Sequence, residues 1–121
     1  MEITNLSIKE IKNGFEKKEF SAKQVAKSFL HRIEKEDKEI GSYLSVFSIE
    51  AIKEAEKIDK ARTEKKELGI LAGIPCGLKD NIMVEGQRCS AGSRVLETYI
   101  APYNASVVDK LQKEGSVILG K

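Results

Sequence analysis

The first part of the chain carries apolar residues at helical spacing. Two stripes stand out along it: Ile8, Ile11 and Phe15, followed by Val25, Phe29 and Ile33. Ser7 lies three residues before Glu10, and Ser21 three residues before Gln24. This is capping-box spacing, in which each side chain bonds the otherwise unpaired backbone amide of the other residue. The pattern predicts two helices that begin just after residues 7 and 21.

A third helix is expected after a short extended segment. Residues 43–47 have the composition of a short strand, and Ser48 is positioned to cap the helix that follows. Ala51, Ala55 and Ile58 recur at helical spacing and are expected on its buried side. Residues 1–67 therefore form a mainly helical lead-in.

Residues 68–121 show a different pattern, that of a strand, a loop, a helix and a second strand. The apolar run 74–78 predicts a strand buried on both faces, and 117–119 begin another. A loop is expected over residues 81–101, with a short helical turn at 93–96. The intervening helix is marked by Asn104 as N-cap, by an apolar face and by Gly115 at its end; that face consists of Val107, Val108 and Leu111. A βαβ unit of this kind has parallel strands and a right-handed crossover. We therefore predict an α/β fold in which the sheet is incomplete.

Composition narrows the range of functions. The chain has 121 residues, 40% hydrophobic and 33% charged, as in a globular domain. A net charge of +2 is too small to indicate nucleic-acid binding. Cys76 and Cys89 stand far from the single histidine, His31, and form no metal-binding pattern. No apolar run is long enough for a signal peptide or a membrane span, so a cytoplasmic protein is expected.

Lys79 is the candidate catalytic residue. It follows the predicted strand 74–78, and catalytic groups in open α/β sheets collect at the carboxyl ends of strands. A lysine amine is a useful base near pH 7 only where its pKa is lowered, and Leu78 and Ile82 are candidates for apolar walls that would do so. Asp80 would favour the charged form, but neighbours in an extended chain point to opposite faces. On spacing alone, a surface lysine in a Lys-Asp-Asn turn is the simpler interpretation.

Three motifs carry a resemblance to a known family. They are Gly-Ile-Pro-Cys-Gly-Leu-Lys-Asp-Asn at 73–81, Tyr-Ile-Ala-Pro-Tyr-Asn-Ala at 99–105 and Gly-Ser-Val-Ile-Leu-Gly-Lys at 115–121. Together they resemble the N-terminal part of the amidase signature family, and the resemblance extends over residues 1–121. Cys76 and Gly77 depart from the bulkier apolar or alanine residues expected there. Within the family, the helical lead-in is most similar to the glutaminase subunits of tRNA-dependent amidotransferases (GatA of GatCAB).

The resemblance implies amide hydrolysis by a serine nucleophile, a bridging serine and a lysine that accepts the proton. Lys79 matches the lysine. The segment that carries both serines lies beyond residue 121 in the family, and Ser90 and Ser93 do not match it. We interpret these two as loop or capping residues, and we expect the chain of 121 residues alone to be inactive.

The resemblance to GatA further implies a glutaminase that supplies ammonia for the conversion of Glu-tRNA(Gln) to Gln-tRNA(Gln), or of Asp-tRNA(Asn) to Asn-tRNA(Asn). Its implied partners are GatB-like and GatC-like subunits, and tRNA is met through the complex. ATP and magnesium belong to the GatB-like partner, so no cofactor is expected in this chain. Two alternatives remain open: a binding or assembly module without chemistry, and one half of a split amidase completed in trans.

Overall fold

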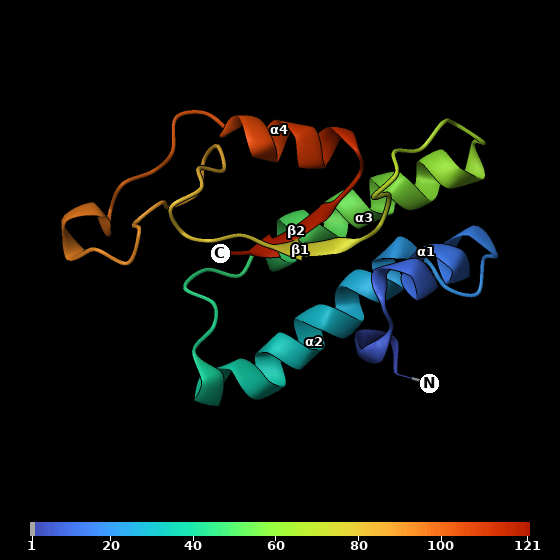
Figure 1. Ribbon diagram of the computed structural model, residues 1–121, viewed down its shortest axis with the longest axis horizontal. Helices are drawn as coiled ribbons and strands as arrows, with labels where there is room; N and C mark the ends of the chain where they lie inside the picture. Colours follow the sequence, from blue (N-terminus) through green and yellow to red (C-terminus); the bar gives the residue numbers. More distant parts are fainter. Residues whose placement is uncertain (1) are drawn as a thin grey trace.

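The computed structural model describes residues 2–121. The helices in order are η1 (Ile3–Asn5), α1 (Ile8–Glu16), α2 (Ala22–Ile40), α3 (Ser48–Thr63), η2 (Arg94–Leu96) and α4 (Ser106–Lys113). Strand β1 (Pro75–Gly77) follows α3, and β2 (Val117–Gly120) follows α4. Figure 1 shows the strands side by side in the middle of the molecule, with α4 on one side and α1, α2 and α3 on the other.

The two strands form a parallel sheet, as the βαβ pattern predicted. Pro75 pairs with Val117 and Cys76 with Ile118, and an irregularity then brings Gly77 opposite Gly120. Burial on both faces was predicted for the strand at 74–78 and is wrong for β1, in which Pro75 and Cys76 are partly buried and Gly77 is exposed. The four residues of β2 are all buried. Within residues 2–121, β1 pairs on one side only, and Cys76 is half-buried.

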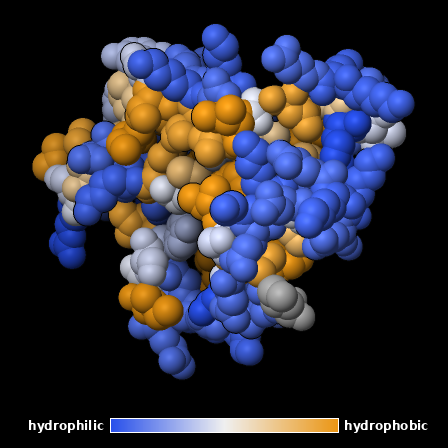
Figure 2. Space-filling model, turned by 45° about the vertical axis from the view of Figure 1, so that its right-hand side comes forward, coloured by the Kyte–Doolittle hydropathy of each residue, from blue (hydrophilic) through white to orange (hydrophobic). Residues whose placement is uncertain are grey.

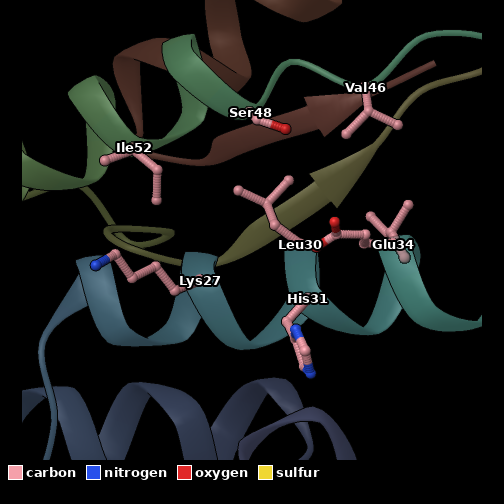
Figure 3. A pocket seen from close by; sticks show the side chains of 8 residues that line it. Lys27, Leu30, His31, Glu34, Val46, Ser48 and Ile52 are labelled. Carbon is pink, nitrogen blue, oxygen red and sulfur yellow. The ribbon is translucent and has the colours of Figure 1, made fainter.

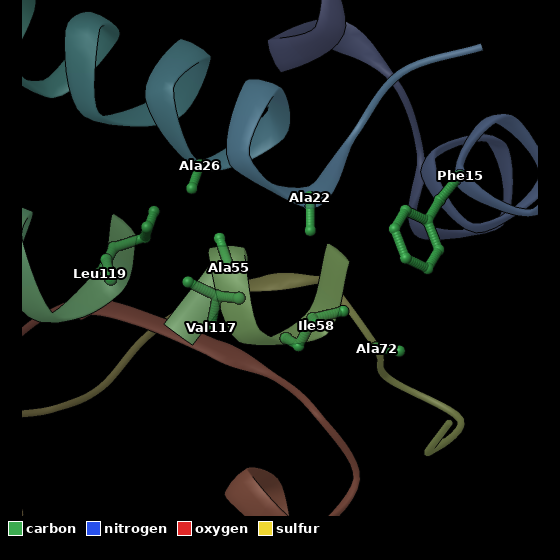
Figure 4. Close-up of a cluster of buried hydrophobic side chains, with 9 residues drawn as sticks. Phe15, Ala22, Ala26, Ala55, Ile58, Ala72, Val117 and Leu119 are labelled. Carbon is green, nitrogen blue, oxygen red and sulfur yellow. The ribbon is translucent and has the colours of Figure 1, made fainter. Parts of the chain in front are cut away.

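Alternate residues of β2 enter two different cores. Val117 and Leu119 contact the helices α2 and α3, whereas Ile118 lies in a second cluster with Val108 of α4. In the first cluster, α2 and α3 meet through alanines, which let the helices approach closely: Ala22, Ala26, Ala51 and Ala55. Figure 4 shows Val117 and Leu119 of β2 on the side of Ala26 and Ala55. The sheet is therefore covered on both faces, as in α/β proteins.

Local signals for the helix starts were partly confirmed. Both capping boxes are present, at Ser7 with Glu10 and at Ser21 with Gln24. Ser48 is not a cap: α3 has Phe47 at its N-cap, and the amide of Phe47 donates to the carbonyl of Leu119 at 2.7 Å. This backbone contact fixes the helix start one residue earlier than Ser48 would.

Three further predictions need correction. Asn104 does not cap α4, whose N-cap is Ala105, because the side-chain Oδ1 atom of Asn104 accepts from the Glu85 amide at 2.7 Å. Residues 43–47 form no strand and contribute one antiparallel bridge, from Val46 to Gly120. Ile8 and Val107 are 62% and 46% exposed, so they do not belong to the buried faces expected of them.

Other predictions for the second half hold. The helical turn expected at 93–96 is η2, and Ser93 caps it by accepting from the Val95 amide. Gly115, with φ of +84°, ends the turn after α4 in a conformation that favours glycine. The handedness of the crossover stays a prediction.

Several large apolar side chains stay at the surface. Figure 2 shows hydrophobic atoms exposed among hydrophilic ones on the face it presents. The segment 91–100 is exposed at every position and extends away from the rest of the chain on the left of Figure 1. Its exposed apolar residues include Val95, which is 90% exposed, together with Leu96, Tyr99 and Ile100. Within residues 2–121, no helix is both long and apolar enough to cross a lipid bilayer.

Candidate functional site

Lys79 follows β1 at the carboxyl end of the sheet, where the sequence placed it. The strand pairing continues just before it, because the Leu78 amide donates to the Gly120 carbonyl at 3.0 Å. The Lys79 carbonyl then accepts from the Ile82 amide at 3.0 Å, which turns the chain. The side chain of Lys79 is exposed and, within residues 2–121, takes part in no ion pair or side-chain hydrogen bond. Its amine is therefore free to meet a reacting group.

Lys79 lines a cavity of about 260 Å³ at this end of the sheet. The other residues that line it come from the segments on either side of the strand ends: Ser42, Leu44, Leu78, Asp80, Asn81, Ala91, Gly92 and Lys121. Leu78 lines the same cavity, but within residues 2–121 Lys79 is exposed and the apolar enclosure expected for its amine is not found. Ile82 does not line the cavity and instead contacts the cluster of Phe47 and Val108.

Asp80 is buried directly behind Lys79. Its carboxylate is 7% exposed, and its Oδ2 atom accepts from both the hydroxyl and the amide of Ser90, the latter at 3.1 Å. The Nζ atom of Lys121, whose side chain is fully buried, lies 3.3 Å from Asp80 Oδ1. The chain turns at these residues, with Lys79 exposed and Asp80 buried.

The contact between Lys121 and Asp80 is an ion pair without an aligned hydrogen bond. Within residues 2–121, Asp80 Oδ1 has no hydrogen-bond donor, although the ammonium of Lys121 is close enough to balance its charge. Burial alone would raise the pKa of Asp80, but the bonds from Ser90 and the charge of Lys121 outweigh it and hold this pKa below its usual value. Asp80 is therefore a buried, ionised carboxylate near neutral pH.

Backbone contacts hold Lys121 in place. Its carbonyl accepts from the amides of Leu44 and Ser45, at 2.7 and 3.1 Å, and its own amide donates to the Ser45 carbonyl at 2.8 Å. The ammonium also donates to the Arg88 carbonyl at 3.3 Å. The segment 42–46 thus closes one side of the cavity, a role the sequence had not indicated.

Ser90 lies in a loop, as predicted, but its role was missed. Besides bonding Asp80, its hydroxyl oxygen accepts from the Gly92 amide at 3.3 Å, and the Asp80 carbonyl accepts from the Ala91 amide at 3.0 Å. The loop 89–92 is therefore tied to the residue that follows Lys79. An oxygen that bonds a buried carboxylate in this way is a structural group rather than a free nucleophile.

His31 and Cys76 do not line this cavity. His31 is exposed on α2 beside a larger hollow of about 520 Å³, and Figure 3 shows its ring directed away from Leu30, Val46 and Ser48. Burial raises the pKa of the Cys76 thiol, and Cys89 is buried. Within the described residues 2–121, no three His, Cys, Asp or Glu side chains are grouped so as to hold a metal ion.

The arrangement supplies one exposed amine beside a buried, charge-balanced carboxylate in a small cavity. Among the described residues that line this cavity, Ser42 carries the only hydroxyl.

The chain is similar in sequence to known amidases. Residues 24–121 match the Amidase family. The chain is 43% identical over 121 residues to the GatA-type subunit of the glutamyl-tRNA(Gln) amidotransferase of Clostridium botulinum (strain Hall), and 44% identical over 115 residues to that of Fusobacterium nucleatum. These matches cover 100% and 95% of this chain but 25% and 24% of those proteins. The chain thus spans about a quarter of the length of these relatives.

Solved structures show the same fold fragment. A peptide amidase from Stenotrophomonas maltophilia superposes with a TM-score of 0.90 at 29% identity, over 97% of this chain and 24% of that one. A fatty acid amide hydrolase gives 0.89 at 27% identity, over 97% and 21%. Since the family match covers most of the chain and the fold agrees, the chain belongs to the amidase signature family.

Proposed function

We propose that this chain contributes the proton-accepting lysine of a glutaminase, as the N-terminal portion of a GatA-type amidotransferase subunit. The observation that carries the proposal is the position of Lys79, whose amine is free at the carboxyl end of β1 in a cavity of about 260 Å³. Identity of 43% along the whole chain to the GatA-type subunit of a glutamyl-tRNA(Gln) amidotransferase supports the choice of substrate class.

In this function Lys79 accepts the proton that leaves a serine nucleophile through a bridging hydroxyl. A hydroxyl is a weak nucleophile until an oriented base removes its proton, so the reaction needs the neutral amine of Lys79. Both serines and the groups that stabilise the oxyanion would come from a segment that follows this chain in its relatives. Ammonia released from glutamine would then serve to amidate Glu-tRNA(Gln) or Asp-tRNA(Asn).

The proposed partners follow from the same relatives. A GatB-like protein would bind ATP and magnesium and activate the carboxylate borne by the tRNA, and a GatC-like protein would join the two. We assign no cofactor to this chain, and we place the complex in the cytoplasm, where tRNA is aminoacylated.

The test uses a completed subunit, in which residues 1–121 replace the matching quarter of the Clostridium botulinum relative. Lys79→Ala should lower kcat for glutamine hydrolysis on the order of 10³-fold, because loss of one member of a coupled proton-transfer unit disables the unit. Lys79→Arg should fail similarly, since a guanidinium stays protonated at any useful pH.

Lys113→Ala, at an exposed lysine of α4, is the matched control and should leave kcat unchanged. The chain of 121 residues alone should release no ammonia from glutamine. Near-normal turnover by either Lys79 variant would return this residue to the interpretation of a surface lysine in a polar turn.

A further inference from the structure

The carboxylate of Asp80 poses an electrostatic problem for the proposed base. Lys79 and Asp80 are adjacent, and both line the same cavity. A negative charge close to an amine favours the ammonium form and raises the pKa of the amine. A base that must be neutral therefore requires that this carboxylate be balanced by something other than Lys79.

The negative charge of Asp80, which follows β1, is balanced by a residue that follows the other strand, β2. Lys121 follows β2 as Lys79 follows β1, and its fully buried ammonium lies 3.3 Å from Asp80 Oδ1. The Ser90 hydroxyl and amide occupy the other carboxylate oxygen. Within residues 2–121, Lys79 forms no ion pair with Asp80. The ion pair with this carboxylate is formed by the buried Lys121 instead.

The other ionisable groups around this end of the sheet are engaged or neutral. The Arg88 guanidinium donates to the Leu44 carbonyl at 3.2 Å, and the Asp37 carboxylate accepts from the amides of Ser42 and Tyr43. Burial raises the pKa of the Tyr43 hydroxyl and that of the Cys76 thiol, which keeps both neutral at pH 7. The buried Cys89 thiol donates to the Asp80 carbonyl at 3.3 Å. Lys79, Asp80 and Lys121 are thus the ionisable residues that line the cavity.

We propose that Lys121 is a positioning residue that neutralises Asp80, so that the amine of Lys79 can lose its proton and act as a base. The inference rests on the proposed function of Lys79. Lys121 touches no reacting group; it acts through Asp80, which it also fixes behind the end of β1. Removing the charge of Lys121 leaves Asp80 uncompensated beside Lys79 and holds the proton on the amine.

The direct test is a titration of Lys79 in the chain of 121 residues, followed by NMR signals of lysine side chains. Lys121→Met should raise the pKa of Lys79, because it leaves the charge of the adjacent Asp80 uncompensated. Lys121→Arg keeps the charge and should leave this pKa unchanged. The double variant Asp80→Asn/Lys121→Met removes both charges and should return it close to its original value.

The single variant Asp80→Asn tests the same proposal independently, because it can be measured even if Lys121→Met does not fold. With the carboxylate gone and Lys121 still charged, the pKa of Lys79 should fall. Backbone amide spectra establish for each variant that the native fold is kept. A Lys79 pKa that stays constant in the folded variants, within about 0.1 unit, would overturn the proposal.

The rate profile of the completed subunit separates this inference from the proposed function. In Lys121→Met, the acidic limb of the plot of kcat/KM for glutamine against pH should move to higher pH. In Lys121→Arg, this limb should stay where it is in the unchanged protein. If Lys79→Ala leaves hydrolysis intact, the proposed function is wrong whatever the titration gives. If Lys79→Ala abolishes hydrolysis, and Lys121→Met changes neither the pH profile of kcat/KM nor the titration of Lys79, the charge-balancing role of Lys121 is wrong. Lys79 then remains the proposed base.

Discussion

Asp59 of α3 caps the N-terminus of α2 from a distance in sequence. Its Oδ1 atom accepts from the Ala22 amide at 2.8 Å and its Oδ2 from the Lys23 amide at 3.0 Å. These are two of the amides that a helix leaves unpaired at its start, and the positive end of the helix dipole lies at the same place. The Arg62 guanidinium, 3.8 Å from Oδ1, supports the carboxylate. Asp59 therefore joins the two helices that form most of the core.

Asp59→Ala should lower the free energy of unfolding by about 2–3 kcal/mol. Loss of a capping side chain costs up to about 2 kcal/mol, and the favourable contact with the helix dipole adds about 0.3–1 kcal/mol. The Asp59 side chain is 22% exposed, so water compensates only part of this loss. Asp59→Asn keeps one acceptor and should cost about half as much.

Urea unfolding at pH 7, followed by circular dichroism, measures this difference. Glu56→Gln is the matched control, because Glu56 lies on the same helix and pairs with the side chain of the same Lys23 at 2.6 Å. That pair is exposed, and its loss should leave the unfolding midpoint close to its original value. If Asp59→Ala shifts the midpoint no more than Glu56→Gln does, the capping argument is refuted.

Two further predictions concern pH and a glycine. The native pKa of Asp80 lies below the ordinary value of 3.8. Its contribution to stability is therefore present above pH 3.8 and is lost as the pH falls through the native pKa. Urea midpoints measured from pH 7 to about pH 2.5 should fall less steeply in Asp80→Asn than in the unchanged chain. Gly115→Ala should cost more than about 1 kcal/mol, since φ is +84° and a Cβ would lie 2.9 Å from the Ala72 Cα. Gly86→Ala, with φ of +78° but open space around it, should cost less in the same urea assay, and equal costs would show that the contact with Ala72 is unimportant.

The helix starts show where sequence reasoning succeeds. Ser7 with Glu10 and Ser21 with Gln24 interact across three residues, so the local sequence contains both partners. Ser48 is the same residue type at a helix start, but the backbone of its neighbour Phe47 pairs with Leu119, which is 72 positions away. A long-range contact of this kind leaves no local signal.

The exposure of single residues was harder to predict than the fold. Alternation and spacing correctly indicated helices before a parallel βαβ unit, because burying one face of each element requires that pattern. They placed Ile8 on a buried face, although it is 62% exposed and Ile11 in the same stripe is 3% exposed. Periodicity defines the direction of a face, but the width of the buried part depends on what covers it.

In the candidate site, too, the local sequence identified one residue and missed the residues that are distant along the chain. Lys79 was found because it directly follows an apolar run, whereas Ser90 and Lys121, which contact the adjacent Asp80, are 11 and 42 positions further along the chain. The sequence did contain one usable signal for Lys121. Parallel strands end at the same edge of a sheet, so the residues after β1 and after β2 must meet there, and Asp80 and Lys121 carry opposite charges. Which of the two lysines pairs with the carboxylate depends on the tertiary fold: Asp80 is buried beside Lys121, whereas Lys79 is exposed and, within residues 2–121, forms no ion pair.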